Sequence, residues 1–206
     1  METLTPAKIS DGSSKESASS KESPRERILS AAHDLFYKNG LHVVSVDQIA
    51  EAASSNKMTL YRHFKSKDEL IAECARECAR EWEDEWKQNV DAHPGDPLGA
   101  LRAWCRGIAD CMTAEQRGCF MANAAVELAQ TDHPARRVIE ASKRQHRDAL
   151  ISLAAEAGYV DPEALGDALF LTMEGARICN QSVCQAHASD RIYAMLDALI
   201  VTHKRK

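Results

Sequence analysis

The feature that most constrains the fold of this chain is a series of helix-start signatures in its first third. Each is a Ser followed three residues later by Glu or Gln, so that the Ser can cap the first helical turn and the acid or amide can bond back. The signatures are Ser23–Glu26, Ser45–Gln48 and Ser66–Glu69. The first also places Pro24 at the first helical position, where proline is favoured. Three helix starts so close together predict a small domain of short helices.

Apolar residues recur at helical spacing after each of these starts. The first helix is expected to end at Asn39-Gly40, and a short extended piece, Leu41–Val44, should lead to the second. A break over 54–57 precedes a seven-residue helix that begins near Lys57 and turns Leu60 and Phe64 inward. The third signature should then open a long helix that ends near residue 90.

The rest of the chain also predicts helices. Only 9 Gly and 6 Pro leave little material for the tight turns of an all-β protein. Five further helices are expected over Leu98–Thr113, Phe120–Gln130, Pro134–Ala157, Pro162–Ala186 and Asp190–His203. The chain is therefore predicted to be all-α, with about nine helices.

Charge and composition divide the chain into three parts. Residues 1–22 are rich in Ser, Lys and Glu and are expected to be a disordered tail. The net charge of -5 hides an asymmetry, because residues 21–67 hold eight basic and five acidic residues while residues 68–206 hold 16 basic and 23 acidic ones. We expect a polyanion-binding domain over 23–67 and an acidic domain over 68–206.

Two short helices joined by a tight break, the second one cationic, are typical of a helix-turn-helix that enters the major groove of DNA. Any small three-helix bundle contains such a pair, so the pattern alone leaves a purely structural role open.

The residues between Arg27 and Leu70 carry more than this pattern, and they resemble the N-terminal domain of the TetR family of bacterial one-component transcriptional regulators, of the TetR/AcrR type. The matching residues are Ile28-Leu29, Ala31-Ala32, Leu35-Phe36, Asn39-Gly40-Leu41, Val46, Ile49-Ala50, Ala53, Lys57, Thr59-Leu60-Tyr61, His63-Phe64 and Lys65-Ser66-Lys67-Asp68-Glu69-Leu70. The chain departs from the family in the turn, where Ser54-Ser55-Asn56 replaces the usual Gly-Val-Ser, and at Met58. The lost turn glycine predicts a somewhat different turn conformation.

The resemblance implies a homodimer that binds double-stranded DNA at a palindromic operator and represses transcription until a small, mostly apolar effector binds the C-terminal domain. The predicted DNA-binding residues are Ser45, Lys57, Met58, Thr59, Tyr61, Arg62, His63, Lys65 and Lys67. We expect Lys57, Met58 and Thr59 to read bases and the others mainly to contact the sugar-phosphate backbone, with Arg62 able to do either. Core packing for Tyr61 and a plain surface position for His63 are the alternatives.

The C-terminal domain is expected to bind the effector and to form the dimer. The predicted dimer interface comprises Leu165, Leu169, Thr172, Ala176, Cys179, Val183, Ile192, Met195, Leu196 and Leu199. Burial of the same faces within one monomer is the alternative. The predicted effector pocket comprises Trp86, Trp104, Ile108, Met112, Cys119, Phe120, Met121 and Phe170. Aromatic and Met residues at helical spacing can equally form an ordinary core.

Other function classes receive weaker support. Seven scattered cysteines predict reduced thiols, and with no apolar stretch long enough for a membrane span or a secretory signal the chain is expected in the cytoplasm. Cys119, beside Arg117 and near a helix start, could serve a thiol-based redox sensor. No cofactor or metal is predicted, because paired Cys-x-x-Cys or His-x-x-x-His spacing is missing. No catalytic motif is convincing, so an enzyme built on a helical bundle is only a formal alternative.

Overall fold

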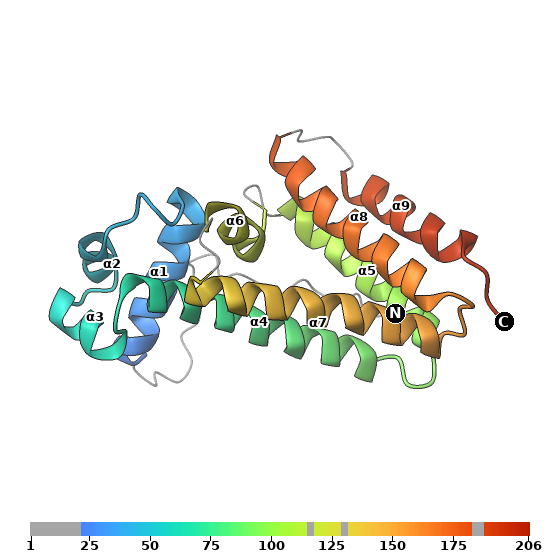
Figure 1. The fold of residues 1–206 in the computed structure, drawn as a ribbon, viewed down its shortest axis with the longest axis horizontal. Helices are drawn as coiled ribbons and strands as arrows, with labels where there is room; N and C mark the ends of the chain where they lie inside the picture. The colour runs from blue at the N-terminus through green and yellow to red at the C-terminus, as the bar shows by residue number, and fades with distance from the viewer. Residues whose placement is uncertain (1–21, 115–117, 129–131, 183–187) are drawn as a thin grey trace, which may run out of the picture.

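The computed structural model describes residues 22–114, 118–128, 132–182 and 188–206. Within these ranges the chain folds into nine α-helices without a β-strand of its own, which confirms the all-α prediction (Figure 1). The helices are α1 (Pro24–Asn39), α2 (Val46–Ala52), α3 (Lys57–His63), α4 (Lys67–Asp91), α5 (Pro97–Ala114), α6 (Phe120–Glu127), α7 (Pro134–Glu156), α8 (Pro162–Ser182) and α9 (Ala188–Thr202). The predicted tail, except for residue 22, lies outside the described residues.

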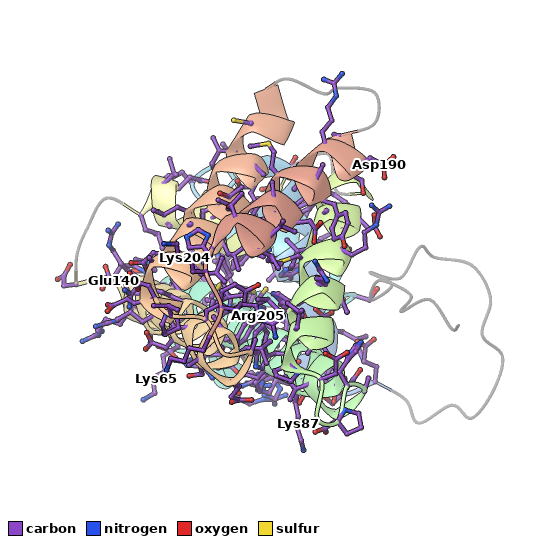
Figure 2. The ribbon with its side chains drawn as sticks, turned by 90° about the vertical axis from the view of Figure 1, so that its right-hand side faces the viewer. Lys65, Lys87, Glu140, Asp190, Lys204 and Arg205 are labelled. Atoms are coloured by element: carbon purple, nitrogen blue, oxygen red, sulfur yellow. The ribbon has the colours of Figure 1, made fainter. Side chains whose placement is uncertain are left out.

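The molecule is elongated, with α1–α3 at one end and α5, α8 and α9 toward the other (Figure 1). The long helices α4 and α7 run side by side from the first group into the second, and α6 lies between the two groups. We call the α1–α3 end the head and the opposite part the body. Figure 2 views the body end, where Asp190 of α9 and Lys87 of α4 lie on opposite sides, with Lys204 and Arg205 between them.

Two of the three predicted capping boxes form completely. The Oγ atoms of Ser23 and Ser45 each accept a hydrogen bond from the backbone N–H three residues on, and the Glu26 and Gln48 side chains bond back. The third box is only half formed. Ser66 Oγ accepts from the Glu69 N–H at 3.0 Å, but the Glu69 carboxylate pairs with Arg76 at 2.9 Å instead of returning to the cap. A charged partner about two helical turns away competes successfully for that carboxylate.

The turn that joins α2 to α3 takes an unusual backbone conformation. Ser54 has a φ of 47°, in the left-handed region that glycine occupies without steric cost. The serine therefore does the work of the glycine that the family uses in this turn, at some cost in strain. Asn56 then caps α3, because its Oδ1 accepts from the Thr59 N–H at 2.8 Å; this cap was not predicted.

The segment Leu41–Val44 forms a turn instead of the predicted extended piece. Leu41 and Val44 are both buried in the head, while His42 and Val43 between them are exposed. Burying both apolar ends of so short a segment requires the chain to double back. Periodicity alone cannot distinguish such a turn from a strand.

Two apolar cores hold the fold together. The first joins the head to the start of α4, to α6 and to the start of α7, and includes Ile28, Leu60, Leu70, Met121 and Ile139. The second joins α5, α7, α8 and α9, with two tryptophans of α4 at its edge. The head core therefore crosses residue 67, where the sequence predicted a domain boundary. That boundary remains a prediction, and the head packs with α4, α6 and α7 as one apolar unit.

Candidate nucleic-acid interface

The short helix α3 is anchored to the head on one side and open on the other. Leu60 and Phe64 are buried in the head core, since they are 0% and 3% exposed. The side chains on the remaining surface of this segment point outward. Exposed residues here are Lys57, Met58, Tyr61, Arg62, His63 and Lys65, and Thr59 is half-buried. Met58 is 83% exposed, so its side chain is free of contact with the head core. The α3 surface brings together most of the predicted DNA-binding residues.

Lys57, at the start of this surface, is held by an ion pair. Its Nζ lies 3.1 Å from Oδ2 of Asp47 in the first turn of α2, and both side chains are more than half exposed. Sequence reasoning missed Asp47, because the pairing joins two helices across the turn and no local motif signals it.

Ser45 and Lys67 lie outside the exposed surface that α3 and Lys65 form. Ser45 is exposed at the start of α2, where its Oγ already serves as the cap. Lys67 is half-buried, and its ammonium lies 5.8 Å from the centre of the Phe36 ring. Burial lowers the pKa of Lys67, although Asp68 and Glu127 oppose that shift. The Lys67 side chain thus rests on the head core, at the first residue of α4.

An arginine and glutamate network covers the junction of α1 and α4. Arg25 and Arg76 bond the two carboxylate oxygens of Glu73 at 2.9 and 2.7 Å. Burial would raise the pKa of Glu73, but the hydrogen bonds from Arg76 and Arg25 outweigh it and leave the pKa below its ordinary value. This network ties the start of the head to the long helix that enters the body.

Helix α6 is also bonded to the head. The Glu127 carboxylate accepts from the Leu41 N–H at 2.7 Å, and the Glu127 carbonyl lies 3.1 Å from the His42 ring. Gly40, with a φ of 89°, lets the backbone come so close that an added Cβ would lie 3.2 Å from that carboxylate. The buried His133 caps α7 and lies 3.5 Å from Asp68 of α4. The head is thus linked to the body through α4, α6 and α7.

The predicted effector-pocket residues fall into two separate places. Trp104, Ile108 and Phe170 line a cavity of about 20 Å³ in the second core, and Trp86 and Met112 pack within the same core. Cys119, Phe120 and Met121 belong to the head core instead, so the structure does not bring them together with the other predicted pocket residues. The reason is that α6 turns its apolar side toward α1 and α4, a choice that helical periodicity cannot specify.

The cavity has further walls that the sequence analysis missed. They are Trp82, His146, Leu150, Met173, Glu174 and Arg177. Three of these residues, His146, Glu174 and Arg177, are polar or charged, and a prediction based on apolar residues at helical spacing does not include them. They come together only because α7 and α8 pack against each other in the fold.

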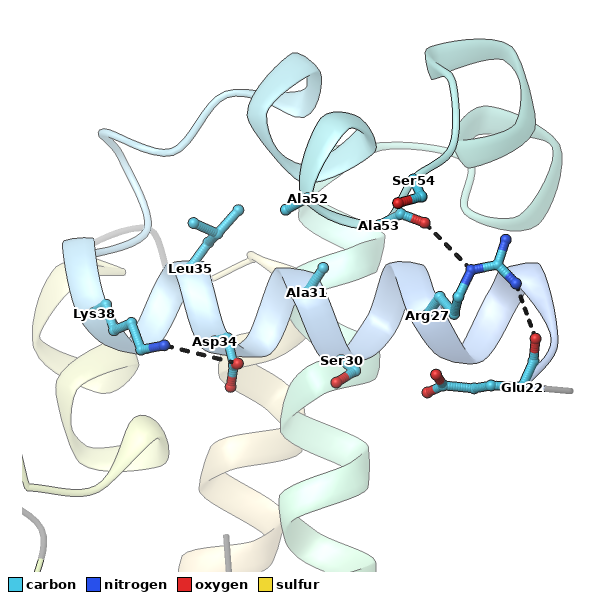
Figure 3. Close-up of a pocket in the computed structure, with 10 residues that line it drawn as sticks. All are labelled: Glu22, Arg27, Ser30, Ala31, Asp34, Leu35, Lys38, Ala52, Ala53 and Ser54. Carbon is cyan, nitrogen blue, oxygen red and sulfur yellow. Dashed lines mark hydrogen bonds and ion pairs between the residues drawn. The ribbon is translucent and has the colours of Figure 1, made fainter. Parts of the chain in front are cut away.

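A larger hollow of about 390 Å³ lies on the head, between α1 and the end of α2 (Figure 3). It is open to solvent and lined largely by charged or small side chains. Arg27 spans it by donating to the backbone oxygens of Ala53 and Glu22, at 3.3 and 2.9 Å, and Lys38 pairs with Asp34. Organic ligands are usually enclosed by apolar walls, so this hollow does not have the character of an effector site.

The predicted dimer residues are also divided. Leu165, Leu169 and Leu196 are 0% exposed in the second core, so a partner has no surface of theirs to cover and the prediction is wrong for these three. Thr172, Ala176, Ile192 and Leu199 are half-buried, whereas Cys179 and Met195 are exposed. Val183 lies outside the described residues. The exposed apolar side chains missed by the prediction are Leu171 and Ile178 on α8 and Val201 on α9. Helix periodicity identified the apolar helices but not which side faces outward.

The described cysteines are free thiols. Burial raises the pKa of the Cys74 and Cys78 thiols, and it raises that of Cys105 to about 12, so all three stay protonated and unreactive at neutral pH. Cys119 is the half-buried N-cap residue of α6, where its side chain makes no capping bond. Within the described residues no group of three His, Cys, Asp or Glu side chains could hold a metal ion. The helices described there include none long and apolar enough to cross a membrane.

Comparisons with known proteins agree with this arrangement. Residues 28–74 match the family model described as bacterial regulatory proteins, tetR family. The chain is 30% identical to the HTH-type transcriptional regulator AcrR of Shigella flexneri over 93 residues, which are 45% of this chain and 43% of that protein. It is 45% identical to UidR of Escherichia coli over 47 residues, 23% of this chain and 24% of the relative. The alignments therefore span less than half the length of these curated relatives.

Similarity to a solved structure extends over most of the chain. A TetR-family transcriptional regulator from Streptomyces coelicolor superposes with a TM-score of 0.81 and 28% identity, over 86% of this chain and 94% of that one. The similarity therefore includes the body as well as the head. The names of these relatives describe transcriptional regulators, in agreement with the prediction that this chain is no enzyme. Residues 28–74 therefore match the N-terminal domain of the TetR family of bacterial transcriptional regulators, and the fold of the described residues is similar to that of a solved TetR-family regulator.

Proposed function

We propose that this protein is a DNA-binding transcriptional regulator that acts as a homodimer on a palindromic operator. In this proposal it represses transcription in the cytoplasm, and a small, mostly apolar effector releases it from the DNA. The observation that carries the proposal is the anchored helix α3, in which buried Leu60, together with the buried Phe64 directly after the helix, fixes the orientation of an exposed cationic face. A helix held in this way can enter a major groove without unfolding its own domain.

The exposed side chains supply the two kinds of contact that a DNA site requires. Arg62 and Lys65 can neutralise phosphates, and Tyr61 can donate a hydrogen bond to a phosphate oxygen. Lys57, Met58 and Thr59 occupy the first turn of α3, and the N-terminal residues of a recognition helix are those that reach base edges. Lysine favours guanine, while the Met and Thr methyl groups can contact the thymine methyl.

The outer faces of α8 and α9 support a two-fold dimer. Leu171 and Met195 are 67% and 60% exposed, and Ile178 and Val201 also leave apolar surface in water. Covering such side chains with a second copy removes this apolar surface from solvent. A two-fold axis would place two α3 helices on successive half-sites, as an operator with inverted symmetry requires.

The helices α4 and α7 provide a path from the body to the head. Each contributes side chains to the cavity of the second core, Trp82 from α4 and His146 from α7. Each also starts in the head core. At 1.5 Å per residue, Trp82 lies about 22 Å along α4 from its first residue, Lys67. A displacement of either helix at the cavity would therefore move the head of one protomer relative to the other.

Selection of bound sequences from random double-stranded DNA tests the proposal. We expect an enriched palindrome with half-sites about one helical turn apart, bound with an affinity that falls steeply with salt. Enrichment of no sequence, with no complex at low salt, would contradict the function. Repeating the selection with Lys57→Ala should change the preferred bases, whereas Tyr61→Ala should weaken binding to all sequences similarly. The opposite result would mean that the two contact types are assigned wrongly.

A further inference from the structure

All three tryptophans of the chain lie together at one place in the body. Trp82 and Trp86 are one turn apart on α4 and stack with ring centres 5.5 Å apart. Trp104 of α5 meets both edge-on, at 5.8 and 5.0 Å. Two of the three, Trp82 and Trp104, line the 20 Å³ cavity, whose far wall includes Phe170 of α8. Flat aromatic walls of this kind favour a flat aromatic ligand.

The same cavity has a charged end. Lys143 Nζ lies 2.6 and 2.7 Å from the two carboxylate oxygens of Glu174, and Arg177 Nε lies 3.7 Å from one of them. The Lys143, Glu174 and Arg177 side chains are only 17%, 28% and 15% exposed. Burying an ion pair costs about as much desolvation energy as the attraction returns, so stability alone does not account for such a group in a core. Recognition of the polar part of a ligand does account for it.

Two cations converge at this end of the cavity. Lys143 and Arg177 both face the half-buried Glu174 carboxylate, and the neighbouring His146 ring stacks on Trp82 with centres 3.7 Å apart. The pKa of His146 falls to about 3, because burial and the charges of Lys143 and Arg177 all oppose its protonation. Glu85 of α4 is the remaining nearby acid that senses Arg177, and its side chain lies toward solvent. Two partly buried cations that converge on one carboxylate can also donate hydrogen bonds to a second anionic group.

The present size of the cavity connects binding to a conformational change. About 20 Å³ holds one water molecule and no aromatic ring. A ring can therefore enter only if the α8 wall, with Phe170 and the flexible Met173, moves away from α4 and α7. A ligand that binds only the opened form must shift the protein toward that form, which is what an effector has to do.

We propose that this cavity is the effector site and that its ligand is a planar aromatic carboxylate, with the ring against Trp82 and Phe170 and the carboxylate directed to Arg177 and Lys143. The ligand carboxylate would share these two cations with Glu174. The inference rests on the proposed function, because it names the chemistry of the effector of such a regulator. It also refines the mostly apolar effector proposed above by adding one negative charge.

Isothermal titration calorimetry of the full-length protein without DNA tests this assignment. The probes are 2-naphthoate, its neutral isostere 2-naphthamide, and the cationic 2-naphthyltrimethylammonium. We expect 2-naphthoate to bind at least tenfold more tightly than the amide, and the cation to bind more weakly than either. Equal affinity for acid and amide, tightest binding of the cation, or binding of no probe would overturn the proposal. This comparison needs no variant, so it stands even if a substitution prevents folding.

Variants then locate the site. Arg177→Gln should reduce naphthoate affinity at least tenfold and change naphthamide affinity less than threefold, because only the acid uses the charge. Arg147→Gln is the matched control: it removes a cation from α7 whose partners, Asp167 and Glu163, lie outside the cavity, and naphthoate affinity should be unchanged. Equal losses for the two probes with Arg177→Gln, or a loss with Arg147→Gln, would contradict the assignment.

The two proposals fail in different experiments. A protein that binds naphthoate but selects no DNA sequence would refute the regulatory function and leave the site intact. A protein that selects a palindrome but binds none of the probes would refute the site and leave the regulatory function intact.

Discussion

The ammonium of Lys57, the first residue of α3, lies 3.1 Å from the carboxylate of Asp47 in the first turn of α2. The residue best placed to read a base is thus already paired with an acid on the same exposed surface. A DNA phosphate or guanine approaching Lys57 has to share it with that carboxylate, and the carboxylate itself repels DNA.

Asp47→Asn should therefore strengthen DNA binding. We expect affinity for the selected operator to rise about threefold to tenfold at low salt, and the free energy of unfolding to change by less than about 1 kcal/mol, because exposed ion pairs stabilise little. Fluorescence anisotropy across a salt series measures the first and urea unfolding the second. Glu51→Gln, which removes an exposed acid from the same helix, should have the smaller effect on affinity. Weaker binding by Asp47→Asn would show that the acid orients Lys57.

Ser54→Gly should stabilise the fold. The left-handed conformation of Ser54 costs an L-residue about 1–2 kcal/mol, and glycine avoids that cost. Glycine also raises the conformational entropy of the unfolded chain, which offsets part of the gain in stability. We expect a net gain of about 0.5–1 kcal/mol in urea unfolding. The neighbouring Ser55, whose φ is not positive, is the control: Ser55→Gly should lower stability by a similar amount. Loss of stability with Ser54→Gly would mean that the serine side chain stabilises the turn.

Glu127→Ala should loosen the link between α6 and the head. The lost bond from the Leu41 N–H is a charge-assisted one, so we expect the free energy of unfolding to fall by about 1.5–3 kcal/mol. Glu127→Gln keeps an accepting oxygen and should recover more than half of that loss. Glu156, the last residue of α7 as Glu127 is of α6, is exposed, and Glu156→Ala should change stability by less than about 0.5 kcal/mol. Equal losses of unfolding free energy in Glu127→Ala and Glu156→Ala would show that the hydrogen bond from the Leu41 N–H to Glu127 does not stabilise the fold.

Acid should destabilise the protein partly through His146. The folded-state pKa of about 3 lies below the unfolded value of 6.5, so the unfolded chain binds the extra proton as pH falls between these values. From pH 7 to pH 5 this one group removes about 2 kcal/mol of unfolding free energy. His146→Phe keeps a ring but cannot be protonated, so its urea-unfolding stability should fall by about 2 kcal/mol less than that of the wild type. The control is His63→Phe, at an exposed position, and this variant should lose as much unfolding free energy between pH 7 and pH 5 as the wild type. Identical losses in all three proteins would rule out the contribution of His146.

The outer faces of α8 and α9 give a test of the dimer. A Leu171→Glu/Met195→Glu double variant places two charges among exposed apolar residues. We expect it to sediment as a monomer at a micromolar concentration at which we expect the wild type to sediment as a dimer. Its operator affinity should fall by at least tenfold, because half-sites would then be bound independently. Val126→Glu, which alters an equally exposed apolar residue on α6, should leave the dimer intact. A dimeric double variant would place the interface elsewhere.

The amino-acid sequence by itself determined where the helices of the head begin and which residues anchor α3. Ser23, Ser45 and Ser66 act locally on the next turn, so their positions fixed where α1, α2 and α4 begin. The inward side of α3 was equally predictable, since Leu60 and Phe64 are apolar and lie four residues apart, about one helical turn. Helix starts and helical faces depend on residues within a few positions of each other, and such information is visible in the order of the chain.

Only the tertiary structure decided which apolar faces meet. It assigned Phe120 and Met121 to the head core, Leu165 and Leu196 to the interior of the body, and Leu171 to the outside. It also brought Trp82 of α4, His146 of α7 and Arg177 of α8 to one cavity, and Asp47 to Lys57. Helical periodicity gives the same apolar stripe whether the partner is the same chain, another copy or a ligand. The choice among these depends on long-range packing of helices far apart in the sequence, which no local pattern encodes.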